Sequence, residues 1–600
     1  MTLRVELTAR LLLAGACWLF ANAYAGAAAD AAPEKARALF SAYHEWQLRE
    51  RPTFATAVGD HRYDDRLTDF SEGAIARRKA AVADFARQLR DIDRNALSGQ
   101  DRVSYDVLVL LLDYDRRRSA VFSEPDALGA DLWLSVTRFN GPQIGFMGLP
   151  QLIRVSRFAS VADYENFVKR LDAVPKQIKE IESGLRRAIV QGWLPPRAVV
   201  RRVPEQIDAL LVDIEANPIY APFRRFPASV ASEERERLAA LGRSALIDEV
   251  IPAFRELRAF YVSRYLPACG EAFSAASRPS WSKAYAAAVA SQTTTSLSPS
   301  EIHALGSKEV ARIGAEMDAL VKRIGFKGTR PEFAHWLETA PEMHYARPAE
   351  MLAAYRDIAM RVEPELPRLF AELPRLPFGI RAMDAAEGDN AEHYTRGAAD
   401  GTRPGYFEAN VNNVLRRSKA DMVTLLLHEG VPGHHLQVSR AMELKDLPAF
   451  RRMAFLPAYG EGWALYAESL GDELGVYGDP YAKFGYLSSE MFRACRLVVD
   501  TGIHAFGWTR ERAIRYLVDN SGITEANAVA EVDRYYVNPG QALAYKIGEL
   551  KIKALRAKAR SELRDRFDIR RFHNALIDDG PLPLSVLEER IDEWIASNRR

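Results

Sequence analysis

The spacing of apolar residues predicts a chain that is mostly helical. Apolar residues recur every three or four positions in five segments rich in Ala, Leu, Arg, Lys and Glu, which places them on one face of a helix. These segments are residues 74–97, 162–192, 232–264, 298–324 and 541–565. Ser298 marks a helix start, because Pro299 suits the first helical position and Glu301 can bond back to the cap.

Strand signals are few, and the clearest covers residues 405–411, between Pro404 and Asn412. We expect an edge strand there, with Tyr406 and Asn410 as candidates for binding an extended peptide that adds to the sheet. The pattern as a whole predicts a mainly α, two-lobed fold with this small β element near the site.

Two lobes divide the chain in this interpretation. Residues 26–297 form a helical amino-terminal lobe, and residues 298–600 form a helical lobe that carries the chemistry. Residues 1–25 read as a secretory signal peptide, because Arg4 and Arg10 flank the start of a short apolar run that ends near a small-residue cleavage site. We therefore expect an exported protein, periplasmic or secreted, with no stable membrane span.

The chain has three cysteines, which excludes a disulfide framework. A lipid-modified Cys17 fits less well than simple cleavage, since Ala14 stands where a branched apolar residue is usual. Export permits Cys269 and Cys495 to pair, but two separate thiols are the default.

Composition and charge limit the classes of molecule that the protein is expected to bind. Of 600 residues, 81 are Lys or Arg and 80 are Asp or Glu, so the net charge is +1 and no basic excess points to nucleic acid. Histidine is scarce at 11 residues, yet three of them lie between positions 428 and 435.

That histidine cluster carries the candidate chemistry. The apolar segment 422–427 leads into His428 and Glu429, which resemble the start of an H-E-x-x-H zinc motif, where glutamate is the general base. Pro432 stands where the second histidine belongs, and histidines follow at 434 and 435.

Helix geometry bears on the choice between these two histidines. In an unbroken helix His435 would lie roughly 10 Å along the axis from His428, too far to share one ion. Pro432 and Gly433 favour a break that brings His434 to the second ligand position, and His435 is then a supporting or alternative ligand.

The third ligand is expected to be a glutamate on a following helix. Glu461 comes 27 residues after His434 and is our choice, with Glu468 as its support or the alternative. A structural metal site and a metal-free polar cluster are the competing interpretations.

Four segments together resemble a known family. They read HEGVPGHHLQ from His428, YGEGWALYAESL from Tyr459, RLVVDTGIHAFGWTRERAI from Arg496 and YYVNPGQALAYKIGELKI from Tyr535. They are similar to the bacterial "domain of unknown function 885" family, and the resemblance implies a zinc-dependent peptidase with a gluzincin-like helical fold. The pair Gly433-His434 also resembles the G-H of H-E-x-G-H helical metallopeptidases, with two residues inserted.

A hydrolase of this kind also needs donors for the developing oxyanion and a group that aligns the substrate. Tyr545 and His504 are the catalytic candidates for the first task. Tyr536 and Arg496 are candidates for substrate binding, since a guanidinium can hold a peptide carboxylate. Tyr535 is a further possible donor.

The sequence therefore predicts an exported zinc hydrolase that cleaves amide bonds in short peptides. One zinc ion would be held by His428, His434 and Glu461, with Glu429 as the general base. The alternatives are a non-catalytic, metal-dependent peptide-binding protein, a zinc amidase or esterase acting on a non-peptide substrate, and a helical scaffold without metal. The cleavage position and the oligomeric state do not follow from the residues.

Overall fold

The structure is a computed structural model that describes residues 32–121, 136–144, 148–271, 281–383, 391–397, 401 and 403–599. The segment 1–25, interpreted above as a signal peptide, lies outside these residues. Within the described part, no helix combines the length and apolar character needed to cross a membrane. The described residues are mainly helical with one small sheet, which confirms the prediction of a mainly α fold.

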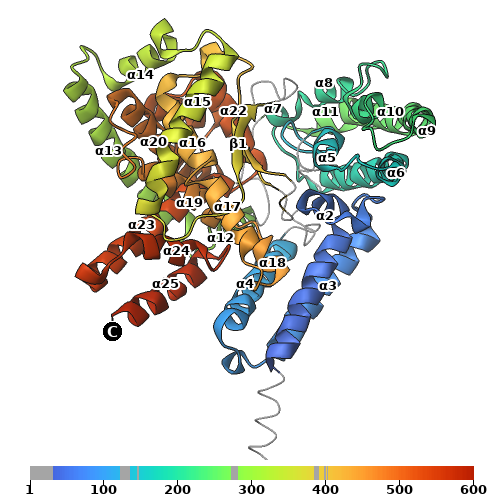
Figure 1. Cartoon of the computed structure of the whole chain (residues 1–600). Helices are drawn as coiled ribbons and strands as arrows, with labels where there is room; N and C mark the ends of the chain where they lie inside the picture. Colours follow the sequence, from blue (N-terminus) through green and yellow to red (C-terminus); the bar gives the residue numbers. More distant parts are fainter. Residues whose placement is uncertain are drawn as a thin grey trace, which may run out of the picture.

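Helices of the first half gather at one side and at the base of the molecule (Figure 1). In chain order they are a helix over 32–50, α2 (Pro52–Val58), α3 (Glu72–Arg90), α4 (Gly99–Val121), α5 (Leu149–Val155), α6 (Val161–Gln191), α7 (Arg197–Val200), α8 (Val203–Asp208), α9 (Ser232–Ser244), α10 (Ile251–Phe260) and α11 (Leu266–Ala268). Short π-helical turns join α9, α10 and α11, so the helix expected over 232–264 is nearly continuous.

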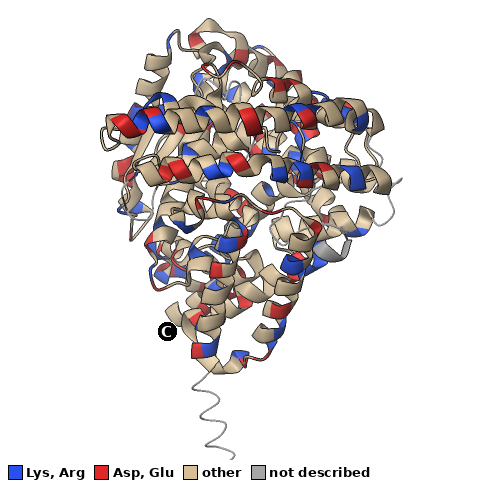
Figure 2. Ribbon diagram, turned by 90° about the vertical axis from the view of Figure 1, so that its right-hand side faces the viewer, with Lys and Arg blue, Asp and Glu red and all other residues tan. Residues whose placement is uncertain are grey.

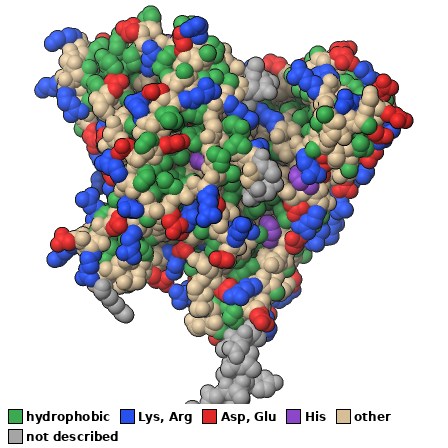
Figure 3. All heavy atoms as spheres, in the orientation of Figure 1, with side chains coloured by type: hydrophobic (Ala, Val, Ile, Leu, Met, Phe, Trp, Pro, Cys, Tyr) green, Lys and Arg blue, Asp and Glu red, His purple; other side chains and the backbone are tan. Residues whose placement is uncertain are grey.

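The remaining helices form a larger group. They are α12 (Trp281–Thr293), α13 (Pro299–Ile324), α14 (Arg330–Thr339), α15 (Pro348–Val362), α16 (Met422–Glu429), α17 (His434–Glu443), α18 (Ala449–Arg452), α19 (Pro457–Ser469), α20 (Pro480–Phe506), α21 (Arg510–Ser521), α22 (Glu525–Val537), α23 (Ala544–Leu563), α24 (Ile569–Ile577) and α25 (Leu584–Asn598). Helix α12 belongs here by its contacts, since Trp281 Nε1 donates to the His504 carbonyl and Tyr285 Oη donates to Asp500. A notch separates the two groups at the top of the view in Figure 3.

Basic and acidic residues are interspersed along the helices in Figure 2. Ser298 caps α13 as expected, because its hydroxyl accepts from the Glu301 amide and the Glu301 carboxylate accepts from the Ser298 amide. Cys269 and Cys495 are both buried free thiols, so they do not pair.

The sheet has three strands, β1 (Phe378–Ala382), β2 (His393–Thr395) and β3 (Gly405–Ala409), in the order β1-β3-β2. Strand β3 is parallel to β1 and antiparallel to β2. The strand expected around 405–411 therefore exists, but the prediction that it is an edge strand is wrong, because both of its sides are paired. Tyr406 lies on this central strand and Asn410, directly after it, is buried, so neither offers an open edge to a peptide.

Helices α19 and α23 cross with their backbones in contact. A Cβ on Gly462 would lie 2.4 Å from Gly548 Cα, and a Cβ on Gly548 would lie 1.9 Å from the Ala458 carbonyl oxygen. Only glycine at both positions permits this approach. It sets Glu461 of α19 beside the first turns of α23, where Tyr545 lies.

A buried ion cluster fixes the same end of α23. The fully buried Lys546 ammonium lies 2.6 Å from a Glu490 oxygen, 2.6 Å from a Glu549 oxygen and 3.2 Å from a Glu309 oxygen. These carboxylates come from α13, α20 and α23, so the cluster ties three helices together. A buried charge is stable only with such partners.

Replacing Gly548 with alanine tests the crossing. We expect Gly548→Ala to lower the free energy of unfolding by about 3 kcal/mol, because the added methyl group overlaps backbone atoms of α19 that cannot move alone. Urea unfolding followed by circular dichroism measures it. Gly478→Ala is the control, since a Cβ at Gly478 meets nothing within 4 Å. Equal stability of the two variants would contradict the described crossing.

Candidate metal centre

The chain turns sharply between α16 and α17. Helix α16 ends at Glu429, α17 begins at His434, and the Val431–Pro432 peptide bond between them is cis. A Cβ on Gly433 would lie 2.0 Å from the His428 carbonyl oxygen, so this position accepts only glycine. The helix break expected from Pro432 and Gly433 is present.

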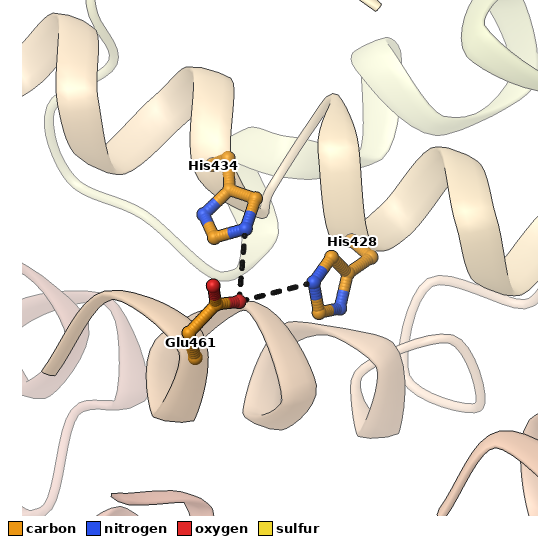
Figure 4. A group of neighbouring side chains, drawn as sticks. All are labelled: His428, His434 and Glu461. Carbon is orange, nitrogen blue, oxygen red and sulfur yellow. Dashed lines mark ion pairs between the residues drawn. The ribbon is translucent and has the colours of Figure 1, made fainter. Parts of the chain in front are cut away.

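The turn brings two histidines onto one carboxylate (Figure 4). Glu461 Oε2, on α19, lies 3.6 Å from His428 Nε2 and 3.4 Å from His434 Nε2. Candidate ligand atoms of the three residues all lie within 4.8 Å of one another. Within the described ranges, this trio is the one group of His, Cys, Asp or Glu spaced to hold a metal ion.

Glu468 orients His428. The buried Glu468 carboxylate accepts a hydrogen bond of 2.7 Å from His428 Nδ1, which leaves Nε2 free to face Glu461. Burial disfavours the charged imidazole, but the Glu461 and Glu468 carboxylates outweigh it and raise the pKa of His428 to about 9. The pKa of Glu461 is held well below its usual range, because His428 and His434 outweigh the effect of burial.

His435 points elsewhere, toward the sheet. Its Nε2 lies 3.0 Å from the Leu376 carbonyl oxygen, its Nδ1 lies 3.1 Å from Tyr394 Oη, and its ring stacks on Phe378. Burial lowers the pKa of His435 to about 4, so it is neutral near pH 7. The geometry thus separates the two neighbouring histidines: His434 meets Glu461, and His435 fastens α17 to β1 and β2.

Glu429 lies on the side of His428 that faces Glu461. Its Oε1 is 4.0 Å from His428 Nε2, and its side chain is 11% exposed. A buried pair that the sequence did not reveal lies close by: Glu392 accepts a 2.7 Å bond from Arg417 Nε. Burial chiefly raises the pKa of Glu392, and the charge of Glu429 adds to the shift. Glu392 went unnoticed because it falls in a stretch that resembles a loop.

Tyr545 lies next to the cluster, on α23. Burial raises its pKa, and the negative charge of Glu461 raises it further. The Arg496 guanidinium carbon lies 4.5 Å from the centre of the Tyr545 ring. Tyr545 is therefore a neutral hydroxyl donor beside the candidate ligands.

His504 and Tyr536 lie in the core instead. His504 Nε2 is 2.9 Å from the Tyr535 carbonyl oxygen, and the His504 ring packs against Tyr285 and Trp281 of α12. Tyr536 is 2% exposed and packs against His504. The catalytic role expected for His504 and the substrate contact expected for Tyr536 therefore gain no support, because α20 and α22 turn these residues toward α12 and one another.

Asp500 is a buried carboxyl in the same part of the core. It accepts a 2.6 Å bond from Tyr285 Oη and a 3.1 Å bond from the Gly540 amide, which joins α12, α20 and the start of the α23 segment. Burial raises the pKa of Asp500 to about 7.

The chain matches, over residues 52–591, the family model described as "Bacterial protein of unknown function (DUF885)". The chain belongs to this family. This match confirms the family membership that the sequence motifs predicted. No curated protein matches the chain.

Two solved structures resemble this DUF885 member. One is described as "the putative lipoprotein from Colwellia psychrerythraea"; it is 27% identical, with a TM-score of 0.88, and the match covers 94% of this chain and 99% of that one. The other, "a putative lipoprotein of unknown function from Shewanella oneidensis", is 16% identical, with a TM-score of 0.69 and coverage of 92% and 98%. The second likeness shows the fold alone.

The pH dependence of stability tests the burial of Asp500 in this DUF885 protein. The pKa of Asp500 is about 7 in the folded chain, compared with 3.8 for an ordinary aspartate side chain. The contribution of Asp500 to the free energy of unfolding is therefore complete below about pH 4 and is lost as the pH rises through 7. We expect Asp500→Asn to gain stability relative to the wild type between about pH 4 and pH 8, by at most about 4 kcal/mol. Urea unfolding across this range measures the difference. If the stabilities of Asp500→Asn and the wild type changed in parallel with pH, the burial of Asp500 would be contradicted. Asp519→Asn, at an exposed position, is the control.

Zinc titration separates the roles of the adjacent histidines. We expect His434→Ala to weaken zinc binding by about 100-fold or more, because one of three ligands is lost. His435→Asn should keep one zinc per chain but lower the free energy of unfolding by about 2 kcal/mol, since it loses its buried bonds. Competition with a chromophoric chelator measures the affinity. The reverse pattern would show that the ligand assignment is wrong.

Proposed function

We propose that this protein is an exported, zinc-dependent hydrolase that cleaves amide bonds in short peptides. The observation that carries the proposal is the convergence of His428 Nε2 and His434 Nε2 on Glu461 Oε2, at 3.6 and 3.4 Å. Two imidazoles and one carboxylate form a common ligand set of catalytic zinc.

The spacing of these atoms fits a zinc ion. Ligand atoms about 2.1 Å from a tetrahedral zinc ion lie about 3.4 Å from one another. The two nitrogen-to-oxygen distances are close to this value, and Glu468 already holds the His428 tautomer that presents Nε2. His428, His434 and Glu461 would therefore hold the ion with little rearrangement.

When bound, zinc supplies Lewis acidity, which lowers the pKa of water and polarises a carbonyl group. Glu429 is placed to take the proton of the attacking water on its carboxylate and to deliver it to the leaving amine. Tyr545 donates its hydroxyl hydrogen to the developing oxyanion, since its raised pKa keeps that hydrogen in place.

The burial of the candidate ligands bears on the class of substrate, and the amino-terminal sequence bears on the location. The side chains of His434 and Glu461 are only 16% and 14% exposed, which favours short, flexible peptides over folded proteins. Export is supported by the character of residues 1–25 and by structural neighbours that are described as lipoproteins. A gluzincin-like mechanism is part of the same proposal and agrees with the order of His428, Glu429, His434 and Glu461 along the chain.

Replacing Glu429 tests the proposal. We expect Glu429→Gln to retain one zinc ion per chain but to lower the rate of peptide cleavage by about a thousandfold, because the ligands remain while the base is lost. Elemental analysis and cleavage of a peptide library, read by mass spectrometry, measure the two properties. Glu256→Gln, at an exposed position on α10, is the matched control and should cleave peptides like the wild type. A zinc chelator should abolish peptide cleavage by the wild type.

Other outcomes identify the alternatives. Zinc with intact peptides after long incubation of the wild type would indicate a peptide-binding protein. Hydrolysis of other acyl compounds without cleavage of peptides would indicate an amidase or esterase. Full activity of Glu429→Gln would contradict the assigned base.

A further inference from the structure

Arg496 is a buried guanidinium with one unused nitrogen. Its Nε donates to Tyr535 Oη at 3.2 Å, and its Nη2 donates to Glu531 Oε2 at 3.0 Å. Arg496 is 6% exposed, and its buried Nη1 has no hydrogen-bond partner among the residues that the structure describes. A buried donor without a partner is costly unless a ligand satisfies it.

Among Arg496, Arg534 and Glu531, the positive charges outnumber the negative one. Arg534 Nη2 donates to the same Glu531 Oε2 at 2.8 Å, so two guanidinium groups share one carboxylate. A pair of Glu531 and Arg534 alone would be neutral, and Arg496 adds a surplus positive charge. An anionic ligand at Nη1 would balance the charge of this trio.

The surplus charge lies next to the metal centre. Arg496 Cζ is 4.5 Å from the centre of the Tyr545 ring, and Arg493 Cζ is 5.9 Å from the same ring. Arg493 Nη2 lies 3.9 Å from the Glu468 oxygen that accepts from His428. Tyr545 contacts Arg496 and lies beside Glu461, and its partly exposed ring covers Arg496 on that side.

We propose that Arg496 binds a carboxylate group of the substrate, and that this group is the free carboxyl terminus of a short peptide. The inference rests on the proposed function. A tyrosine side chain separates Arg496 from the metal centre, so the carboxylate lies about one or two residues beyond the cleaved bond. Nη1 of Arg496 supplies the charge-assisted hydrogen bond that a carboxylate accepts. The protein then removes short pieces from the carboxyl end.

Three peptides that differ only in their carboxylate test this assignment. They are acetyl-tetraalanine with a free carboxyl end, its carboxamide, and acetyl-trialanyl-glutamate amide, whose only carboxylate is on a side chain. Binding to zinc-loaded Glu429→Gln protein, which should not cleave them, is measured by calorimetry. We expect the free carboxyl end to bind about 30-fold more tightly than the carboxamide. If only the glutamate peptide bound tightly, the bound carboxylate would be that of a side chain and not the carboxyl terminus, which would overturn the assignment. Equal binding of all three peptides would show that Arg496 does not bind a carboxylate of the substrate.

Arg496→Gln, added to the same protein, tests the residue. The preference for the free carboxyl end should disappear, and a retained preference would overturn the role of Arg496. The melting temperature is measured alongside, so that loss of the preference is read from folded protein. Arg515→Gln, at an exposed arginine on α21, is the control and should keep the preference.

The two proposals can fail separately. Loss of the carboxylate preference with peptide cleavage intact would overturn this inference alone. A carboxylate preference in binding, without cleavage of any peptide by the wild type, would overturn the proposed function and leave the binding site in place.

Discussion

The turn between α16 and α17 depends on Gly433, where a Cβ would lie 2.0 Å from the His428 carbonyl oxygen. In a continuous helix, His434 would lie about 9 Å along the axis from His428. The turn instead brings both imidazoles within 3.6 Å of one Glu461 oxygen. The turn thus brings together candidate ligands that an unbroken helix would hold apart.

The rest of the larger helical group holds the partners of these histidines in place. The glycine contact between α19 and α23 fixes Glu461 relative to Tyr545, and the buried ammonium of Lys546 anchors the same turn of α23. Glu468 and His435 act from opposite sides, since one orients His428 and the other fastens α17 to the sheet. The result is a site made from four helices, α16, α17, α19 and α23.

The sequence allows the helices and the three candidate ligands to be predicted, because both depend on local spacing. Apolar periodicity locates α6 and α13 almost to the residue. Proline beside glycine indicates the break before His434. The order of strands is not local information, so the central position of β3 could not be deduced from its own residues.

Contacts between distant segments explain the other differences. His504 and Arg496 lie two turns apart on α20, yet one faces the aromatic residues of α12 and the other faces Tyr545. Which face meets which neighbour is decided by α22 and α23, far along the chain. The surplus charge at Arg496 likewise becomes visible only when Glu531 and Arg534 are seen together.

Anomalous diffraction from crystals grown with zinc would test the central claim most directly, because it locates the ion without reference to activity. The account predicts one strong peak at the zinc edge, about 2.1 Å from His428 Nε2, His434 Nε2 and a Glu461 oxygen. A peak ligated by His435, or no peak between α16, α17 and α19, would contradict it.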